Sequence, residues 1–472
     1  MIDVIEAKVV DINAESLGIP GSQLMENAGR QSAEYIMKLS KPSKVVVICG
    51  TGNNGGDGAV IARYLDEAGW RVTLALVKLK SNIRTHISRS NVEKLSSTVN
   101  IIENANPEIL AGHPFVVDAM LGIGLDKGPR EPYATWIRRI NECDSKVISI
   151  DVPSGFGTEL AVKPAITLTM HDSKSGMNEG NSGQIEIIDI GIPEEASDFV
   201  GPGDMIHYPI PKPNSHKGQN GHLLIIGGGP YTGAPALSGF AAHSVGVDLV
   251  TIATPEASAS VIASYSPNFI VRPLPGKVLK PEHKELLAPL IEDASAVLIG
   301  PGLGREPETI EAVREILNTI DKPIVVDADG LYAMTGQEVF NIPAVLTPHT
   351  REFTRLGGSQ ELDDASVYQM AEMMKATVLL KRPVDIMSDG QHIKKNCTGN
   401  PGMCVGGTGD VLAGIVGALM SKDVAPFEAA RMGALLSGSS GDLAFKQVGW
   451  SMTATDVIAC MPAVLSRFLS RL

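Results

Sequence analysis

Short apolar runs alternate with stretches of helical periodicity along most of the chain. In the first half, the runs at 45–49, 72–77, 115–118 and 147–150 have the length of buried strands, and helical patterns cover 21–39, 57–69 and 133–143. In the second half, the strand candidates are 223–226, 249–253, 297–299, 324–326, 344–346, 378–380 and 384–387, and a helix-rich end follows from about Gly409. This alternation predicts βα units and a mostly parallel sheet in each half, which is an α/β fold class.

The clearest break in composition lies at residues 201–221. Four prolines (Pro202, Pro209, Pro211 and Pro213) remove backbone donors there, so we expect neither a helix nor a central strand. We therefore predict two domains, 1–206 and 207–472. The length of 472 residues is compatible with this number, because at roughly 100–200 residues per domain it suggests about two to four domains.

Charge and composition exclude several classes of protein. Lysine and arginine number 40 against 53 aspartates and glutamates, so the net charge of −13 argues against a non-specific nucleic-acid binder. No apolar run approaches the roughly 18 residues of a membrane span, and the charged first twenty residues do not resemble a signal peptide. Five cysteines without a C-x-x-C pair do not fit a disulfide framework. We expect a cytoplasmic protein with no nucleic-acid or membrane partner.

The stretch GTGNNGGDG at 50–58 directly follows the first predicted strand. It contains G-x-G-x-x-G at Gly50, Gly52 and Gly55, and the helix N-terminus that follows offers N–H groups to a phosphate or another polar ligand. An NAD oxidoreductase also needs an acid at the end of the second strand, but Lys78 and Lys80 stand there. Lysines suit a 2′-phosphate, so this objection is partial, and a turn shaped only for packing is the alternative.

Two further polar clusters follow strands of the first half. Asp118 ends the strand FVVDA and precedes the glycine loop 122–128, and Asp151 begins the sequence DVPSG. An acid at the carboxyl end of a strand is a base, a metal ligand or a turn cap, and ligands of open α/β sheets collect at this edge. Lys174 is a weaker candidate, because a lone lysine is usually solvated.

These first-half motifs resemble the NAD(P)HX epimerase domain. The resemblance rests on LGIP and LMENAGR within 17–30, then GTGNNGGDG, VDAMLGIG and DVPSG in that order, and it covers most of residues 1–200. It implies a Rossmann-like three-layer α/β/α domain that interconverts the R and S forms of the hydrated nicotinamide cofactor at C6. It further implies Asp118 as the catalytic acid/base and a potassium ion held by Asn54, Asp118 and Ser154. The implied substrate contacts are Asn53, Asn54, Gly55, Gly56, Asp57, Gly122, Ile123, Gly124, Leu125, Asp126, Lys127, Gly128 and Asp151.

The strongest motif of the second half is NPGMCVGGTGDVLAG at 400–414. It is not a P-loop, because no Gly-Lys-Ser/Thr follows the glycines. A glycine turn that begins a helix still offers unpaired N–H groups to a phosphoryl group. Asp410, on the first helical turn, is placed to accept a proton from a hydroxyl that attacks this group. The alternative role is an acid that merely stabilises the helix N-terminus.

G-x-G-D before a helix resembles the ribokinase-fold small-molecule kinases, and the second half more closely resembles the ADP-dependent NAD(P)HX dehydratases. The supporting residues are SHKG at 215–218, GGG at 227–229 with TGA at 232–234, GPGLG at 300–304, DAD at 327–329 and TPH at 347–349 with Glu352-Phe353. The resemblance covers about 215–445 and implies that Asp410 acts on the hydrate in a pocket lined by Ala234, Gly304 and His349. The implied nucleotide contacts are Lys381, Arg382, Pro383, Val384, Asp385, Gly406, Gly407, Thr408 and Gly409. Arg382 departs from the family's usual glycine.

Together the two resemblances predict a two-step repair enzyme. Epimerisation of NADHX or NADPHX supplies the S hydrate, which is then dehydrated to NADH or NADPH at the expense of ADP, with ATP as the alternative nucleotide. Potassium in the first domain and magnesium in the second are the expected ions, and we expect a homo-oligomer. The main alternative is a ribokinase-like small-molecule kinase with a non-catalytic first domain, which would not need Asn54, Asp118, Asp151 and Ser154. An NAD-linked oxidoreductase is the third and weakest reading.

Overall fold

The chain forms two compact units in a computed structural model that describes residues 1–123, 128–470 and 472. Unit 1 is Met1–Ala196 and unit 2 is Ser197–Leu472. The predicted domain boundary near residue 206 falls inside unit 2. There Val200 N–H donates to the Lys395 carbonyl at 2.8 Å, and buried Arg431 Nε donates to Asp204 Oδ1 at 2.6 Å.

Unit 1 contains a seven-stranded sheet in the order β3-β2-β1-β4-β5-β6-β7, and every neighbouring pair is parallel. Its strands are β1 (Lys44–Cys49), β2 (Arg71–Leu76), β3 (Asn100–Ile102), β4 (Phe115–Ala119), β5 (Lys146–Ile150), β6 (Ile166–Met170) and β7 (Gln184–Ile188). The four predicted strands are confirmed. The apolar pattern did not indicate β3, β6 and β7, which are short or interrupted by threonine and glutamate.

The helices of unit 1 are α1 (Val4–Ser16), α2 (Gly21–Leu39), α3 (Asn53–Glu67), α4 (His86–Glu93), α5 (Tyr133–Glu142), α6 (Glu179–Ser182) and α7 (Glu194–Asp198), the last of which runs across the unit boundary. Short 3₁₀ helices cover Lys80–Asn82 and Pro107–Leu110. Helix α3 begins at Asn53 rather than at the predicted residue 57, so two-thirds of the GTGNNGGDG stretch is helical.

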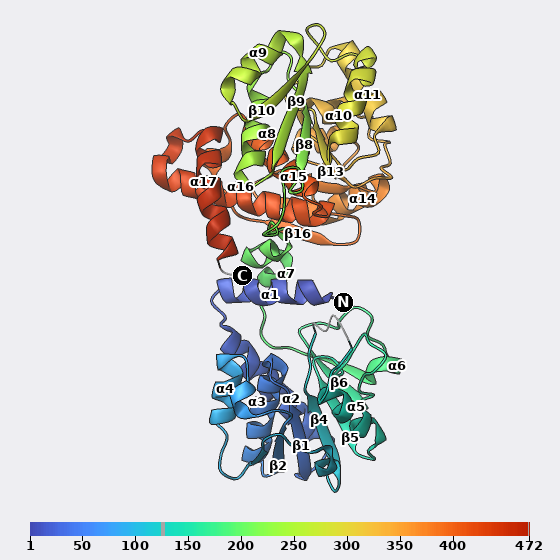
Figure 1. Ribbon diagram of the computed structural model, residues 1–472, viewed down its shortest axis with the longest axis vertical. Coiled ribbons are helices and arrows are strands. Elements are labelled where there is room, and N and C mark those ends of the chain that lie inside the picture. Colours follow the sequence, from blue (N-terminus) through green and yellow to red (C-terminus); the bar gives the residue numbers. More distant parts are fainter. Residues whose placement is uncertain (124–127, 471) are drawn as a thin grey trace. The chain divides into compact units, whose positions relative to one another are not determined.

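Alternate residues of β1 face two different hydrophobic clusters. Val45 and Val47 pack in the cluster that includes residues of α2, α3 and α4, whereas Val46 and Ile48 pack with Trp136 of α5. A strand buried on both faces requires a continuous apolar run, as the sequence has here. Unit 1 is therefore a three-layer α/β/α domain (Figure 1).

Unit 2 contains a nine-stranded sheet in the order β10-β9-β8-β11-β12-β13-β14-β15-β16. The pairs β14–β15 and β15–β16 are antiparallel, and the other pairs are parallel. Its strands are β8 (His222–Ile226), β9 (Leu249–Pro255), β10 (Phe269–Leu274), β11 (Ala296–Ile299), β12 (Ile324–Val326), β13 (Ala344–Leu346), β14 (Thr377–Leu380), β15 (Asp385–Ser388) and β16 (Ile393–Asn396). All seven predicted strands are confirmed, and β10 and β16 were not predicted.

The helices of unit 2 are α8 (Gly233–Ser244), α9 (Glu256–Tyr265), α10 (Lys284–Asp293), α11 (Pro307–Thr319), α12 (Ala328–Ala333), α13 (Thr350–Arg355), α14 (Asp364–Met374), α15 (Thr408–Ser421), α16 (Pro426–Val448) and α17 (Ala454–Leu469). Short 3₁₀ helices cover Pro202–His207, Pro281–His283, Pro401–Met403 and Gly449–Ser451. The first of these corrects our expectation of no helix in the proline-rich stretch. Pro202 stands at the first turn, where its missing N–H is not needed, and Asp204 accepts from Gly201 N–H at 2.8 Å.

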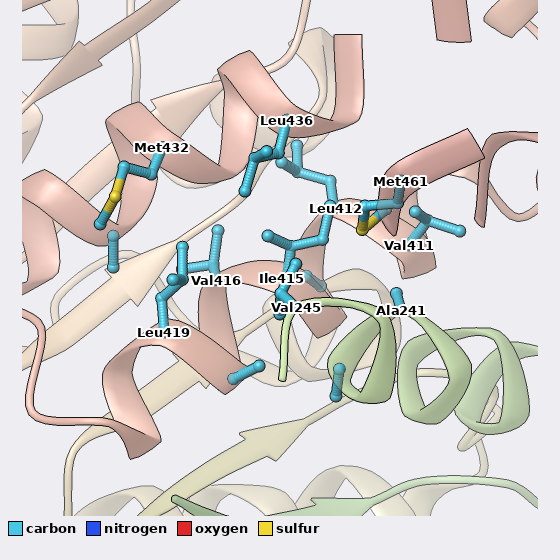
Figure 2. Packing of buried hydrophobic residues seen from close by; sticks show 14 of the residues in the cluster. Ala241, Val245, Val411, Leu412, Ile415, Val416, Leu419, Met432, Leu436 and Met461 are labelled. Atoms are coloured by element: carbon cyan, nitrogen blue, oxygen red, sulfur yellow. The ribbon is translucent and has the colours of Figure 1, made fainter. Parts of the chain in front are cut away.

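Helix α15 lies at the centre of one layer of unit 2. It packs against α8, α16 and α17, and its residues Val411, Ile415 and Leu419 point into the cluster drawn in Figure 2. Every residue from Val411 to Ser421 is buried, so burial on all sides fixes the position of the helix. Asp410, at its start, is therefore held on a rigid element. Within the described part of the chain, no helix is long and apolar enough to cross a membrane.

Candidate active sites

The sheet of unit 1 reverses its strand order between β1 and β4, and ligands of open α/β sheets bind beside such a reversal. Gly50, directly after β1, donates its N–H to the Ala119 carbonyl at 3.1 Å. A Cβ at Gly50 would lie 1.8 Å from the Met120 carbonyl oxygen, so another residue cannot occupy this position without moving the backbone. The two strand ends thus approach more closely than any side chain permits.

Glycines of α3 bring the helix N-terminus down onto these strand ends. A Cβ at Gly55 would lie 2.2 Å from the Gly50 carbonyl oxygen, and one at Gly58 would lie 2.7 Å from the Ala119 Cβ. Packing therefore explains part of the glycine pattern, as the alternative interpretation held. The same close approach places the first turn of α3 beside the carboxyl ends of β1 and β4. A ligand bound at this edge of the sheet would contact the free N–H groups of that turn.

A cavity of about 700 Å³ opens at this edge of unit 1. Six of the predicted contact residues line it, and they come from α3, from the segment after β4 and from the segment after β5: Asn53, Asn54, Asp57, Gly122, Ile123 and Asp151. Gly124, Leu125, Asp126 and Lys127 lie outside the described residues. The cavity has the size of a small-molecule site.

Asn54 has unsatisfied polar atoms in the wall of this cavity. Its side chain is buried, and neither its Oδ1 nor its Nδ2 has a hydrogen-bond partner among the described residues. Leaving a buried amide unpaired costs roughly 1–3 kcal/mol, so such groups normally have a partner. An amide oxygen is a suitable ligand for a hard cation, and the amide N–H₂ is a donor to an anionic or carbonyl group.

Asp118 lies behind the cavity wall, at the end of β4, and is 0% exposed. Its Oδ1 accepts from Ser154 Oγ at 2.6 Å and Met120 N at 3.3 Å, and its Oδ2 accepts from Ser149 Oγ and Ser154 N, both at 2.9 Å. Burial raises the pKa of Asp118 by more than these four hydrogen bonds lower it. Ser154 also accepts from the N–H of cavity-lining Leu121 at 2.9 Å, which joins the carboxylate to the wall.

The structure adds Asp11, which the sequence pattern did not single out, and it gives the weaker candidate Lys174 a charged partner. Lys174, expected to be solvated, is 3% exposed and its Nζ lies 2.6 Å from Asp151 Oδ1. Asp11 of α1 also lines the cavity, and burial, assisted by Asp151 and opposed by Lys174, raises its pKa to about 6. Burial, with Asp151 and Asp11, likewise holds the pKa of Asp57 well above its ordinary value. Asp11, Asp57, Asp151 and Lys174 therefore all lie in the lining of the cavity.

Unit 2 has its own reversal of strand order, between β8 and β11. A Cβ at Gly300, directly after β11, would lie 1.8 Å from the Asp327 carbonyl oxygen, and one at Gly302 would lie 3.3 Å from the Ala234 Cβ. Gly304 N–H donates to Asp329 Oδ2 at 3.0 Å. The predicted pocket residues Ala234 and Gly304 thus lie at adjoining strand ends of the sheet.

Asp410 lies on the first turn of α15, directly after the predicted glycine turn. Gly407, the residue before the helix, has φ +97°, and a Cβ there would lie 2.5 Å from Leu237 Cδ1. Burial raises the pKa of Asp410 to about 7, with Asp327 and Asp329 acting in the same direction and Lys381 against them. The carboxyl group therefore changes charge near neutral pH, which suits a general base.

Lys381 follows β14 and starts the segment predicted to bind the nucleotide. Its Nζ lies 2.8 Å from Asp327 Oδ1. Beyond it, Arg382 N–H donates to Asp385 Oδ1 at 3.0 Å, so the segment 381–385 is a closed turn even with arginine at its second position. Arg382, Pro383 and Val384 are exposed at this turn.

His349 begins helix α13 and accepts at Nδ1 from the N–H groups of Arg351 (3.1 Å) and Glu352 (3.3 Å). Its side chain is 51% exposed, and a backbone bridge pairs it with Lys381. His349 therefore has the capping function of a structural histidine and also stands beside the predicted nucleotide segment.

These features define a two-domain α/β enzyme, with a Rossmann-like unit that carries a buried carboxylate beside a cavity and a ribokinase-like unit that carries a carboxylate at a glycine turn. Comparisons with known proteins agree. A family model described as YjeF-related protein N-terminus matches residues 21–176, and one described as NAD(P)H-hydrate dehydratase matches 223–463. A solved ribokinase-like superfamily protein of Enterococcus faecalis covers 57% of this chain and 96% of its own, at a TM-score of 0.52 and 24% identity. A hypothetical protein of Streptococcus mutans covers 57% of this chain and 99% of its own, at a TM-score of 0.51 and 25% identity.

Relatives that span both units identify the family. A bifunctional NAD(P)H-hydrate repair enzyme of Archaeoglobus fulgidus is 39% identical over 469 residues, which are 98% of each chain. One of Hyperthermus butylicus is 39% identical over 495 residues, covering 98% of this chain and 92% of its own. The chain belongs to the family of bifunctional NAD(P)H-hydrate repair enzymes, and the resemblance and fold class predicted from the sequence are confirmed.

Proposed function

We propose that the chain repairs hydrated nicotinamide cofactors in two steps, with epimerisation of R- and S-NAD(P)HX in unit 1 and ADP-dependent dehydration of the S form in unit 2. The observation that carries the proposal is the pairing of each family domain with its own carboxylate site, Asp118 beside the cavity of unit 1 and Asp410 at the glycine turn of unit 2. Relatives that cover both halves favour this function over a kinase with a non-catalytic first domain.

Epimerisation inverts C6, a carbon that carries a hydroxyl group and adjoins the ring nitrogen. Inversion balances when the hydroxyl loses its proton and the bond from C6 to the ring nitrogen breaks, with its electrons moving to the nitrogen. The nitrogen then closes on the opposite face of the resulting aldehyde as the proton returns to the oxygen. We assign this proton transfer to Asp118, because burial raises its pKa above the ordinary value and makes its carboxylate a stronger base. Asn53, Asn54, Asp57, Gly122, Ile123 and Asp151 would contact the substrate in the cavity.

We assign the expected potassium ion to the same edge of the sheet. Asn54 presents a buried amide oxygen without a partner among the described residues, and the Asp118 carboxylate and Ser154 hydroxyl supply further hard oxygen ligands. When bound, the ion would supply positive charge that keeps Asp118 ordered and stabilises its ionised form. Replacing potassium with sodium is expected to slow epimerisation.

In unit 2, the C6 hydroxyl is a poor leaving group until it is phosphorylated. Asp410 would accept the hydroxyl proton as the C6 oxygen attacks the terminal phosphoryl group of ADP, which releases AMP. Phosphate then leaves with the electrons of the C6–O bond while C5 loses a proton, so the ring double bond of NADH or NADPH returns. Magnesium would accompany the nucleotide as a counterion of its phosphates. The nucleotide itself would bind to two segments, Lys381–Asp385 and Gly406–Gly409.

The test supplies purified S- or R-NADHX with ADP or ATP and follows the absorbance of restored NADH. S hydrate with ADP should give NADH, R hydrate should follow at the rate of epimerisation, and ATP should be the poorer phosphoryl donor. Asp118→Asn should slow recovery from the R hydrate alone, compared as initial rates because epimers also interconvert without enzyme. Asp57→Asn is the comparison variant, because Asp57 lines the cavity itself. If Asp118→Asn recovers NADH from the R hydrate at the wild-type rate and Asp57→Asn does not, Asp57 rather than Asp118 is the acid/base.

A further inference from the structure

A buried ion pair joins two strand ends beside the Asp410 site. Lys381 Nζ lies 2.8 Å from Asp327 Oδ1, with the side chains 21% and 2% exposed. Asp327 follows β12 and Lys381 follows β14, so β13 separates them in the sheet. Thr347, which follows β13, donates from its Oγ1 to the same Asp327 oxygen at 2.8 Å. Three neighbouring strands thus each contribute one group to a single charged cluster.

The cluster aims the Lys381 ammonium at the glycine turn. The Lys381 backbone is fixed by its N–H bond to the Pro348 carbonyl at 2.9 Å. At the other end of the side chain, a Cβ placed on Gly409 would lie 3.3 Å from Lys381 Nζ. The ammonium therefore lies against the residue that directly precedes Asp410.

The charged groups around this point are few among the described residues. The charges that act on the pKa of Asp410 are those of Asp327, Lys381 and Asp329. The charges that act on the pKa of Lys381 are those of Asp327, Glu352 and Asp410. Two of these acids are already engaged elsewhere. Asp329 accepts from Arg305 Nε at 2.9 Å, and Glu352 accepts from the N–H of His349 at 2.9 Å. Asp327 is thus the acid that makes the direct hydrogen-bonded pair with Lys381.

Stability alone gives a weak reason for this pair. Desolvating two charges costs about as much as their attraction returns, and apolar replacements of buried pairs are often neutral or stabilising. A lysine beside a phosphate site, by contrast, needs a fixed position, because its flexible stem otherwise samples many rotamers. A carboxylate anchored by Thr347 supplies that position from outside the predicted nucleotide contacts.

We propose that Asp327 is a positioning residue of the dehydration reaction, which holds the Lys381 ammonium at the Gly406–Gly409 turn beside Asp410, ready to meet the transferring phosphoryl group of the nucleotide. This rests on the proposed function, in which Asp410 accepts the hydroxyl proton. Thr347 orients the carboxylate, and Asp327 itself touches neither reacting group. Misplacing a catalytic cation by about 1 Å commonly costs on the order of 10²-fold in rate.

The test measures S-NADHX dehydration by the full chain across pH, reporting kcat and kcat/KM for ADP. Asp327→Asn keeps an oxygen for Thr347 but removes the charge, so kcat should fall roughly 10–100-fold. The acid limb of kcat/KM should move to lower pH, because a negative charge near Asp410 is lost. Lys381→Met should move the same limb to higher pH. Opposite displacements by two halves of one ion pair are not expected of a merely structural contact.

Controls separate this proposal from folding and from the proposed function. Glu308→Gln removes an acid from an exposed ion pair of the same unit (Lys280 Nζ to Glu308 Oε2, 3.6 Å) and should change neither kcat nor the acid limb. If Asp327→Asn fails to fold, Thr347→Val replaces it and should lower kcat by a smaller factor with the limb unmoved.

Four results are decisive. A folded Asp327→Asn with unchanged kcat and an unmoved acid limb overturns the role of Asp327, and so does unchanged kcat in Thr347→Val when it stands in for that variant. Asp410→Asn, measured in the same series, tests the proposed function on which this inference rests. If that variant keeps its turnover, the proposed role of Asp410 is wrong, whereas an inactive Asp410→Asn beside a normal Asp327→Asn refutes the positioning role alone.

Discussion

Replacing Asp410 with asparagine should abolish dehydration and at the same time stabilise unit 2 at neutral and alkaline pH. The amide has the shape of the carboxyl group but does not ionise. As the proposed general base, Asp410 should account for roughly 10²–10⁴-fold of the rate. The stability gain arises because burial, with Asp327 and Asp329 nearby, disfavours the ionised carboxylate in the folded state.

The size and the pH range of this gain follow from the pKa of Asp410. A rise from the ordinary value of 3.8 to about 7 corresponds to at most about 4 kcal/mol at pH 8. Asp410 is only partly buried, so screening reduces the expected gain to about 1–2 kcal/mol. Because the folded-state pKa is the higher one, the folded carboxyl group retains its proton while the unfolded one loses it. The wild type therefore loses this stability as pH rises from about 4 to about 7, and the variant does not.

Urea unfolding of both proteins by circular dichroism, at about pH 4 and at pH 8, checks the prediction. Equal free energies of unfolding are expected at the lower pH, and a more stable Asp410→Asn at the higher pH, with NADH formation lost throughout. An equally stable or less stable variant at pH 8 would refute the argument that Asp410 is held as a costly buried carboxylate.

Three further predictions concern unit 1 and the independence of unit 2. Asn54→Ala should slow epimerisation and remove the difference between potassium and sodium buffers, whereas a retained potassium preference would place the ion elsewhere. Gly50→Ala should destabilise unit 1 by several kcal/mol, since its Cβ would lie 1.8 Å from the Met120 carbonyl oxygen, while Gly52→Ala, with nothing within 4 Å of the added atom, should change the unfolding midpoint little. Residues 197–472 alone should bind ADP by calorimetry, and a folded fragment without binding would show that unit 1 completes the site.

Strands that consist of a continuous apolar run were predictable from the sequence. Residues 45–49 and 223–226 are continuous apolar runs, and each proved to be a central strand with a cluster on either side. Strands with a mixed pattern were missed. Gln184–Ile188 (QIEII) is an edge strand of unit 1, and Phe269–Leu274 contains a proline that edge positions tolerate. Helix α1 was also missed.

The sequence by itself determined the class of protein, because the glycine turns and strand-end acids are short local motifs that can be recognised, in order, along the chain. Tertiary structure alone decided which charges meet. Asp327 and Lys381 are 54 positions apart, and Asp11 joins Asp151 and Lys174 only because α1 lies at the cavity of unit 1. The expectation that Lys174 lies in solvent was wrong. A lysine is buried only where it has a partner, and the residues next to it in the sequence do not show that partner. Local periodicity reports which side of an element is buried, whereas the pairing of strand ends depends on the order of strands in the sheet, which no single segment encodes.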